Sequence, residues 1–412
     1  MNKYSILFFL VFSISIFAQR TCGTDAKLQE LIKNKPGFAK QYKAVMDYIY
    51  NPNTSKKLFS KQSSTASTVV TIPVVFHILY KNANQNISDA QIQSQLDVLN
   101  KDFRKLNTDF NTVVPNVFKP LAADVEILFC KATKKTDGTT TTGITRKSVP
   151  DTFDFDKSYY TASGEPAWDN TKYLNIWVGS LTNPKYLGFT KFSPTPRSQE
   201  DGVCISYNAF GTIGTAIDPF RKGRSTTHEI GHYLGLLHPW GKDSSLCDTS
   251  DNSDGISDTP ATKNPYYDCP TFPSNANACV ATSNGSMFMN YMDYVDDACM
   301  AFFTLGQKEI MRNTLAGPRL SLLSASGCGN LVEIVDVISV YPNPVSKYFT
   351  ITSSLVPIDE VEVYNVLGQL VKTQKLVQTN NLIDIEDLSS GTYYLRIYNQ
   401  GQFLKSDKLI KE

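Results

Sequence analysis

The sequence predicts a larger α+β domain followed by a small all-β sandwich. Up to about Asn330, strand-like segments rich in β-branched and aromatic residues occur together with an amphipathic helical pattern. Beyond Asn330 the chain holds only short alternating strands between turn residues, and all four histidines and all eight cysteines lie before this point. We place a domain boundary there, because a chain of 412 residues is long enough for about two or three cores.

Charge and composition exclude several classes of protein. The 40 Lys and Arg residues are balanced by 39 Asp and Glu residues, for a net charge of +1. Nucleic acids and anionic membranes bind basic surfaces, so neither is expected as a partner. Apolar residues make up 41% of the chain and aromatic residues 11%, which excludes a disordered polymer.

Residues 1–18 are interpreted as a secretory signal peptide. Lys3 precedes an apolar run from Ile6 to Phe17, and the small residue Ala18 comes before a polar segment. The apolar run is shorter than the roughly 20 residues that a spanning helix needs, and no other segment is apolar enough to span a membrane. We therefore expect secretion into an oxidising environment, where disulfides persist.

Residues 19–68 are polar and Lys-rich, and we interpret them as a pro-segment that ends in an exposed, cleavable linker. The main domain is predicted over residues 69–328. Its first strand is TIPVVFHILY, Thr71 to Tyr80, in which His77 is expected to be a core or supporting residue because no partner lies at ligand spacing.

A capping-box pattern, Ser88 with Gln91, precedes an amphipathic helix that packs on the sheet. Its apolar face is formed by Ile92, Leu96, Leu99, Phe103 and Leu106, and further strands are predicted at Val125–Phe129, Tyr173–Val178 and Leu187–Phe192.

Residues 336–412 are predicted to form the β-sandwich. The segments VISVYPNPVSKYFTITS, EVEVYNVLGQLV and GTYYLRIYNQGQFLKSDKLIK alternate apolar and polar residues, with Pro-Asn, Leu-Gly-Gln, Ser-Gly and Gln-Gly turns.

Three of the four histidines lie in one segment, HEIGHYLGLLH. His228 and His232 are four residues apart, so both lie on one face of a helix and can reach one metal ion. Gly235 can adopt the positive φ that ends a helix, and the turn brings His238 back as a third ligand. Three neutral nitrogen ligands with an open fourth position are typical of catalytic zinc.

Such a site is suited to hydrolysis. Zinc lowers the pKa of a bound water to about 7 and polarises a carbonyl. Glu229, beside the first ligand, is placed to act as general base and to pass the proton to the leaving amine. The alternative is a secreted adhesin or binding protein with a structural zinc site, although such a site needs no base and usually closes its fourth position.

HEIGHYLGLLH resembles the extended zinc motif of the metzincin metallopeptidases, and SMFMNYMDYVDDACM is similar to their Met-containing turn. NYMDY resembles the pappalysin branch, which selects Met292 for the Met-turn and leaves Met287 and Met289 to the core. In that branch the hydroxyl at the Tyr294 position stabilises the tetrahedral intermediate; a purely structural tyrosine is the alternative.

The resemblance covers roughly Thr71 to Cys328 and includes GRSTTHEIGH, SDTPA, MDY and FFTLGQ. It implies a metzincin catalytic domain, with a twisted mixed sheet and the zinc helix above an irregular lower subdomain. It also implies an endopeptidase. A zinc exopeptidase is disfavoured, because that class commonly takes Glu as its third ligand.

An extended substrate would pair with an edge of this sheet. The candidates for the edge are Leu187, Gly188 and Phe189 in the segment LGFT. Several members of the family prefer Arg or Lys after the scissile bond, and Asp296 and Asp297 are the candidates for the matching carboxylate.

Four cysteines follow the zinc motif, and their spacing allows three pairings. The resemblance implies two disulfides, Cys247–Cys279 and Cys269–Cys299. One further pair and one free thiol are expected among the remaining three, which we leave unassigned: Cys130, Cys204 and Cys328.

The same region contains the acidic segment DTSDNSDGISDTPA. Hard oxygen ligands on a flexible loop suit calcium, and the family has calcium near SDTP; a solvated acidic loop is the alternative. The candidate ligands are Asp248, Asp251, Asp254, Asp258 and Thr259, of which we favour the last three.

Cys22 lies in RTCG, directly after the predicted signal peptide, and related pro-enzymes carry a similar Arg-x-Cys-Gly. We predict a cysteine switch, in which the thiolate occupies the open zinc position until the pro-segment is cut; a disulfide is the alternative. The linker residues Lys56, Lys57 and Lys61 are then a candidate autolysis site.

VYPNP, VEVYNVLGQLV and the SGTYYLRI run resemble the C-terminal sorting domain of the type IX secretion system of Bacteroidota, over roughly Val337 to Glu412. A carbohydrate- or matrix-binding module is the alternative. The sequence therefore predicts a secreted or surface-located zinc endopeptidase, made as a latent precursor. We expect a monomer that acts on proteins or peptides, uses Zn²⁺ for catalysis and Ca²⁺ for structure, and leaves the cell through the type IX machinery.

Overall fold

The structure of the chain is a computed structural model. It describes residues 21–51, 69–192, 198–241, 247, 254–324, 327–328, 338–352, 358–376, 382–399 and 401–412. The predicted signal peptide lies outside the described residues, as do Lys56, Lys57, Lys61, Asp248 and Asp251. The chain forms two compact units, residues 1–329 and 330–412, and each is described by itself.

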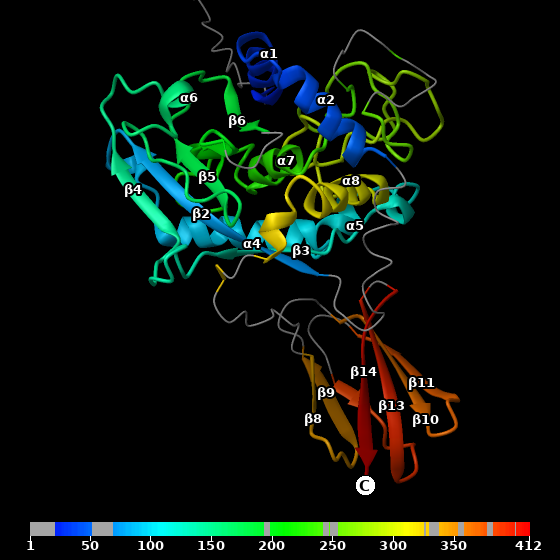
Figure 1. Ribbon diagram of the computed structural model, residues 1–412. Coiled ribbons are helices and arrows are strands. Elements are labelled where there is room, and N and C mark those ends of the chain that lie inside the picture. Colours follow the sequence, from blue (N-terminus) through cyan, green and yellow to red (C-terminus); the bar gives the residue numbers. More distant parts are fainter. Residues whose placement is uncertain are drawn as a thin grey trace, which may run out of the picture. The chain divides into compact units, whose positions relative to one another are not determined.

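The first unit is built on a seven-stranded mixed sheet with the order β1-β6-β7-β5-β2-β3, and β4 also pairs with β2 (Figure 1). The long strand β2 is buried from Ile72 to Leu79; its first half pairs with β3 and its second half with β4. All pairs are parallel except β6 with β7. The strands are β1 (Thr21–Cys22), β2 (Val70–Tyr80), β3 (Ile127–Lys131), β4 (Ile144–Ser148), β5 (Leu174–Gly179), β6 (Tyr186–Lys191) and β7 (Gly202–Ser206).

His77 lies in the centre of β2. Its Nδ1 is 2.8 Å from Thr145 Oγ1 and its Nε2 is 2.9 Å from Asn175 Oδ1. Burial lowers the pKa of His77 to about 4, so the imidazole is uncharged and acts as a hydrogen-bonded core residue.

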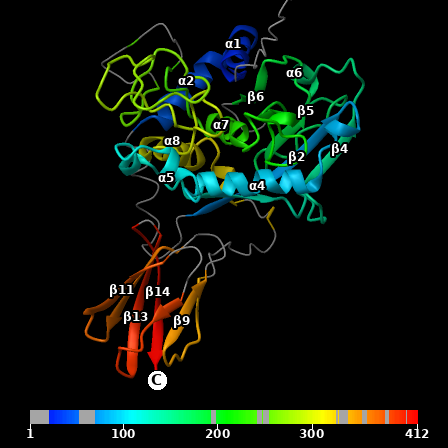
Figure 2. The same cartoon turned by 180° about the vertical axis from the view of Figure 1, so that it is seen from behind.

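Helix α4 (Asp89–Phe103) packs on β3 and on the histidine helix α7 (Arg224–Tyr233), as Figure 2 shows from behind. The Ser88 hydroxyl accepts a hydrogen bond from the Gln91 backbone, as predicted. The capping box is only half formed, because the Gln91 Oε1 that would accept from the Ser88 N–H accepts from the Thr215 N–H instead. The helix ends at Phe103, so Leu106 lies beyond it.

The remaining helices are short or lie near the two ends of the unit. They are α1 (Thr24–Asn34), α2 (Phe38–Ile49), α5 (Phe110–Val113), α6 (Phe155–Ser158) and α8 (Leu305–Ala316), with 3₁₀ turns at Ala83–Gln85, Lys119–Leu121, Tyr207–Ala209 and Leu320–Ser324.

Helices α1 and α2 belong to the predicted pro-segment, whose described residues, 21–51, are more ordered than their polar composition indicates. Strand β1 pairs with β6, α1 packs on β6, and α2 packs on α8. The buried side chains of α2 recur at helical spacing and join the main core: Phe38, Tyr42, Met46 and Ile49.

An irregular segment follows α7. Its described residues before α8 form no helix and no strand longer than one bridge. Disulfides Cys247–Cys279 and Cys269–Cys299 cross-link it, and these are the pairs that the family resemblance implies. A third disulfide joins Cys130 to Cys328, which leaves Cys204 as a buried thiol on β7.

The second unit is a β-sandwich with one apolar core, as the alternating pattern predicts. Four strands form one sheet and three form the other, and Gly368, with φ +75°, lies in the predicted Leu-Gly-Gln turn between β10 and β11. The strands are β8 (Ser339–Tyr341), β9 (Tyr348–Thr352), β10 (Glu360–Asn365), β11 (Leu370–Lys375), β12 (Leu382–Asp384), β13 (Gly391–Asn399) and β14 (Gln402–Lys411). In the part of the chain that the structure describes, no helix is both long and apolar enough to cross a membrane.

Candidate active site

Helix α7 carries the first two histidines and lies at the centre of the first unit, packed against β6, β7 and α4 (Figures 1 and 2). It ends as predicted, because Gly235 adopts φ +92°. The Leu236 N–H donates to Gly231 O and the Gly235 N–H donates to His232 O, which together make a Schellman motif. This turn brings His238 back towards the helix.

The three imidazoles converge on one buried point. The Nε2 atoms of His228 and His232 are 3.1 Å apart, those of His232 and His238 are 3.0 Å apart, and those of His238 and His228 are 3.3 Å apart. All three residues are buried. Each Nδ1 has an oxygen partner at 2.8–2.9 Å: Tyr291 O for His228, Leu236 O for His232 and Asp25 Oδ2 for His238.

Those partners fix the protonation of the rings. An Nδ1 beside an oxygen acceptor carries the proton, so the Nε2 electron pair points to the common centre. Cys22 Sγ lies with the three Nε2 atoms, and these four atoms, which could hold a metal ion, lie within 4.8 Å of one another. Three nitrogens and one sulfur at such a spacing fit a tetrahedral zinc site.

Glu229 lies beside this centre and is buried. Its Oε2 accepts hydrogen bonds from Thr24 Oγ1 at 2.9 Å and from Thr190 Oγ1 at 3.1 Å. A Cβ on Gly188 would lie 2.7 Å from Glu229 Cγ, so only glycine leaves room for the carboxylate arm at this place in β6. Burial raises the pKa of Glu229 to about 7.

Met292 lies under the zinc helix, as expected of a Met-turn residue. It is fully buried, and its Sδ would be 2.4 Å from a Cβ on Gly231. The glycine of HEIGH therefore makes room for the methionine. Met287 and Met289 are buried in the core, as predicted.

Tyr294 lies against the histidines. Its ring centroid is 5.7 Å from that of His228 and 5.0 Å from that of His238. Trp240 stacks on His238 with the ring centroids 4.5 Å apart and meets the Tyr294 ring edge-on at 4.8 Å. The Tyr294 hydroxyl donates to Cys22 O at 3.5 Å.

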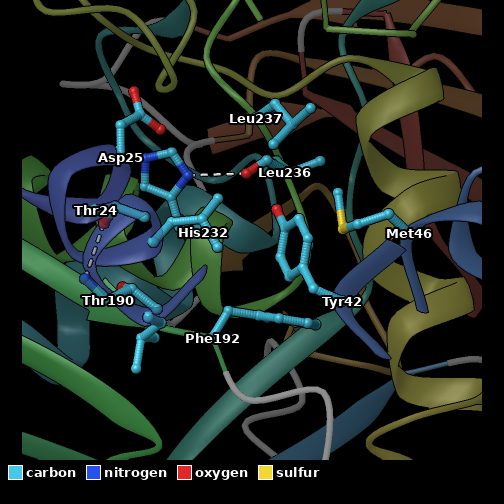
Figure 3. A pocket seen from close by; sticks show the side chains of 12 residues that line it. Thr24, Asp25, Tyr42, Met46, Thr190, Phe192, His232, Leu236 and Leu237 are labelled. Carbon is cyan, nitrogen blue, oxygen red and sulfur yellow. Dashed lines mark hydrogen bonds between the residues drawn. The ribbon is translucent and has the colours of Figure 1, made fainter. Parts of the chain in front are cut away.

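The predicted pro-segment lies along the edge of the sheet next to this centre. Cys22 pairs with Gly188 in the β1–β6 register, the Gly23 N–H donates to Gly188 O at 2.9 Å, and the Thr190 N–H donates to Thr24 Oγ1 at 2.8 Å. Figure 3 shows the adjoining pocket. The pro-segment lines it with Thr24, Asp25, Tyr42 and Met46, and the rest of the unit with Thr190, Phe192, His232, Leu236 and Leu237 among others.

The residues predicted to bind substrate lie in different surroundings. Leu187 is half-buried and Gly188 lies at the site, whereas Phe189 is fully buried in a separate apolar cluster. Asp297 is also fully buried, and its Oδ2 accepts hydrogen bonds from the Lys222 and Arg224 backbone at the positive end of α7. Asp296 is partly exposed.

The favoured calcium candidates are engaged within the protein. Asp254 accepts hydrogen bonds from Thr259 Oγ1 and from the Ile256 backbone, and Asp258 accepts from Thr304 Oγ1 and from the Gly306 backbone at the start of α8. Burial raises the pKa of Asp254 to about 7.

Comparison with known proteins identifies the family. Residues 160–316 match a peptidase family described as pregnancy-associated plasma protein-A. Mature mirolysin from Tannerella forsythia, solved with a cleaved peptide, is 44% identical with a TM-score of 0.57, and the match covers 63% of this chain and 97% of mirolysin. The chain belongs to the pappalysin family of metallopeptidases.

Further matches agree with this pappalysin assignment. A promirolysin mutant from the same organism is 39% identical with a TM-score of 0.63, over 74% of this chain and 97% of promirolysin. An extracellular metalloprotease of Arthroderma gypseum is 28% identical over 305 residues, 73% of this chain and 85% of the relative. Residues 339–412 match a secretion system C-terminal sorting domain. This pappalysin is therefore a secreted or cell-surface metalloendopeptidase, and its family implies zinc.

Several residues of the site were not expected from the sequence. Thr24 and Thr190 contact Glu229 from segments that are far apart in the chain, and Asp25 contacts His238. Trp240 comes two residues after His238, so its nearness to the histidines could have been predicted from the sequence. Thr190 lies in the segment LGFT, for which the sequence predicts only backbone pairing with a substrate.

Replacement of Gly231 by Ala should disturb the Met-turn. Because Met292 Sδ occupies the space that a Cβ would need, we expect a loss of about 1–3 kcal/mol in the free energy of unfolding. Thermal or denaturant unfolding of Gly231→Ala would measure it. The same substitution in a Met292→Ala background serves as the control and should cost less; an equal cost in both backgrounds would contradict the proposed contact.

Proposed function

We propose that this pappalysin is a zinc endopeptidase in which His228, His232 and His238 hold the ion and Glu229 is the general base. The convergence of three buried Nε2 atoms beside a buried carboxylate carries this proposal. A structural zinc site in an adhesin would need no such carboxylate, and the enzyme's family is a peptidase family.

The reaction divides among the residues as follows. When bound, zinc activates a water molecule and polarises the scissile carbonyl. The Glu229 carboxylate accepts a proton from the attacking water and delivers it to the leaving amine. The Tyr294 hydroxyl donates a hydrogen bond to the oxyanion of the tetrahedral intermediate, in keeping with its place beside His228 and His238.

We propose that an extended substrate pairs with β6 at the segment LGFT. Gly188 O and the Thr190 N–H bond the pro-segment in this structure, so the edge can bond another extended chain once the pro-segment has left. Cleavage before Arg or Lys stays a prediction, for which Asp296 is the better candidate because the Asp297 carboxylate bonds the start of α7.

We further propose that residues 19–68 keep the precursor latent through a cysteine switch. Cys22 Sγ lies with the three histidines, and two neighbours of Cys22 engage the same machinery. Thr24 donates to Glu229, and Asp25 accepts from His238. The pro-segment therefore contacts the fourth ligand position, the base and a ligand together.

Calcium binding at Asp254, Asp258 and Thr259 also stays a proposal. Its support is the concentration of carboxylates in a cross-linked irregular segment. A bound cation would lower the pKa of the buried Asp254 carboxylate, which burial alone raises to about 7.

Loss of the base should abolish activity and leave the metal in place. For the activated enzyme we expect Glu229→Gln to lower kcat by about 10²–10⁴-fold, because general base catalysis contributes that much. His232→Ala should lose both zinc and activity. Cleavage of a quenched protein substrate measures the rates, and mass spectrometry of the products locates the cuts.

The same samples test the other parts of this proposal. Metal analysis should find one zinc per wild-type chain and calcium in addition, and chelation of zinc should stop cleavage. If the activated wild type binds zinc but cuts no protein, the endopeptidase proposal is wrong. If the products show no internal cuts before Arg or Lys, the proposed specificity is wrong. If no calcium is found, the calcium site is wrong.

Removal of the switch residue should activate the precursor. We expect Cys22→Ala to be more active than the wild-type precursor, since it frees the fourth ligand position, and Thr24→Val to give a smaller increase. Activity is measured on chains shown by gel electrophoresis to be intact. A Cys22→Ala precursor as inactive as wild type would argue against the switch, and N-terminal sequencing of the mature enzyme would test cleavage near Lys56, Lys57 or Lys61.

Deletion of the second unit, residues 330–412, should leave the protein in the periplasm. The match to a sorting domain implies that this unit addresses the type IX machinery. Cell fractionation of a type IX-competent host that expresses the full chain or the truncated chain measures this. Normal export of the truncated chain would instead favour a binding module.

A further inference from the structure

Strand β6 contributes two residues to the surroundings of Glu229. Gly188 and Thr190 are two residues apart, so they lie on the same face of the strand, the face towards α7. Gly188 leaves space for the carboxylate arm, because a Cβ there would lie 2.7 Å from Glu229 Cγ. Thr190 supplies a hydrogen-bond donor next to that space.

The Thr190 hydroxyl reaches two acceptors of the same residue. Its Oγ1 is 2.8 Å from Glu229 O and 3.1 Å from Glu229 Oε2. Thr190 is 1% exposed, and a hydrogen bond to a carboxylate is strong where water is excluded. The single proton of this hydroxyl is shared between the two acceptors, and the contact ties the Glu229 side chain, which extends from α7, to β6.

A second hydroxyl, that of Thr24, also donates to the Glu229 carboxylate, but it is present only in the precursor. Thr24 Oγ1 is 2.9 Å from Glu229 Oε2, and Thr24 lies in the pro-segment. Once the pro-segment has left, the hydroxyl of Thr190 on β6 still contacts Glu229 Oε2. Its importance should therefore be greatest in the active enzyme.

We propose that Thr190 is a positioning residue for peptide hydrolysis, whose hydroxyl holds the Glu229 carboxylate in the orientation that proton transfer requires. This inference rests on Glu229 being the general base. A catalytic carboxylate must lie within hydrogen-bond reach of the proton it accepts, and a neighbouring donor that fixes its rotamer maintains that reach.

The backbone of Thr190 has a separate task. Its N–H bonds Thr24 Oγ1 in the precursor and is the donor offered to an extended substrate afterwards. A change of side chain leaves this N–H in place. Loss of the hydroxyl should therefore lower kcat and leave KM near the wild-type value.

The test compares activated wild type, Thr190→Val and Thr190→Ser on a quenched peptide. We expect kcat of Thr190→Val to fall about tenfold or more, the effect of losing a hydrogen bond to a charged group, with KM and zinc content unchanged. Thr190→Ser keeps the hydroxyl and should recover most of kcat. Thr314→Val is the matched control, because it removes a buried hydroxyl that donates to Ile310 O within α8, and it should keep wild-type kcat.

Three results would overturn this inference: wild-type kcat in Thr190→Val, a raised KM with unchanged kcat, or a fall in kcat that follows a loss of zinc. Glu229→Gln, measured beside them, separates the two proposals. If Glu229→Gln is inactive and Thr190→Val is normal, only the role of Thr190 fails. If Glu229→Gln keeps wild-type activity, the general base and Thr190 fail together.

Discussion

The burial of a polar helix is the constraint on which the catalytic unit depends. All ten residues of α7 are buried, although most of them are polar. Each such group needs a partner, because an unpaired polar group costs free energy in the interior. Helix α4 supplies Gln95 for Thr226 and Asp102 for Thr227, and Asp109 holds Arg224 through two hydrogen bonds. These contacts explain why Gln95 and Asp102 lie on the buried face of α4, where most of the other residues are apolar.

The same burial prepares the site for its chemistry. Burial lowers the pKa of His232 to about 3, so the ring is uncharged at neutral pH and its electron pair is available to a metal ion. The orientation of His228 depends on the Tyr291 carbonyl, and the Tyr291 hydroxyl in turn donates to Asp102 on α4. His228 is therefore connected to α4 through Tyr291 and Asp102.

Local patterns in the sequence predicted what depends on short separations in the chain. Strand β2, the Ser88 cap and the turn at Gly235 all follow from residues within a few positions of each other. The contact of Thr190 with Glu229 spans 39 residues and depends on how β6 packs on α7, which no local pattern encodes. The apolar residues of α2 recur at helical spacing, but residues 19–68 are polar and Lys-rich overall, and that composition predicts an exposed segment. The engagement of Asp297 with α7 likewise required the three-dimensional structure.

The proposed latency and the proposed binding of substrate depend on one strand edge. In the structure, Gly188 O and the Thr190 N–H bond the predicted pro-segment, and the Thr24 hydroxyl joins the Thr190 N–H to the Glu229 carboxylate. A substrate that pairs with β6 as we propose would meet the same two backbone groups, because they belong to β6. Under that proposal, the segment inhibits by satisfying the hydrogen-bonding groups that a substrate would use. Loss of that segment would remove Asp25 from His238 and Thr24 from Glu229. The Nδ1 partners of His228 and His232 and the Thr190 hydroxyl lie outside the segment and would stay in place.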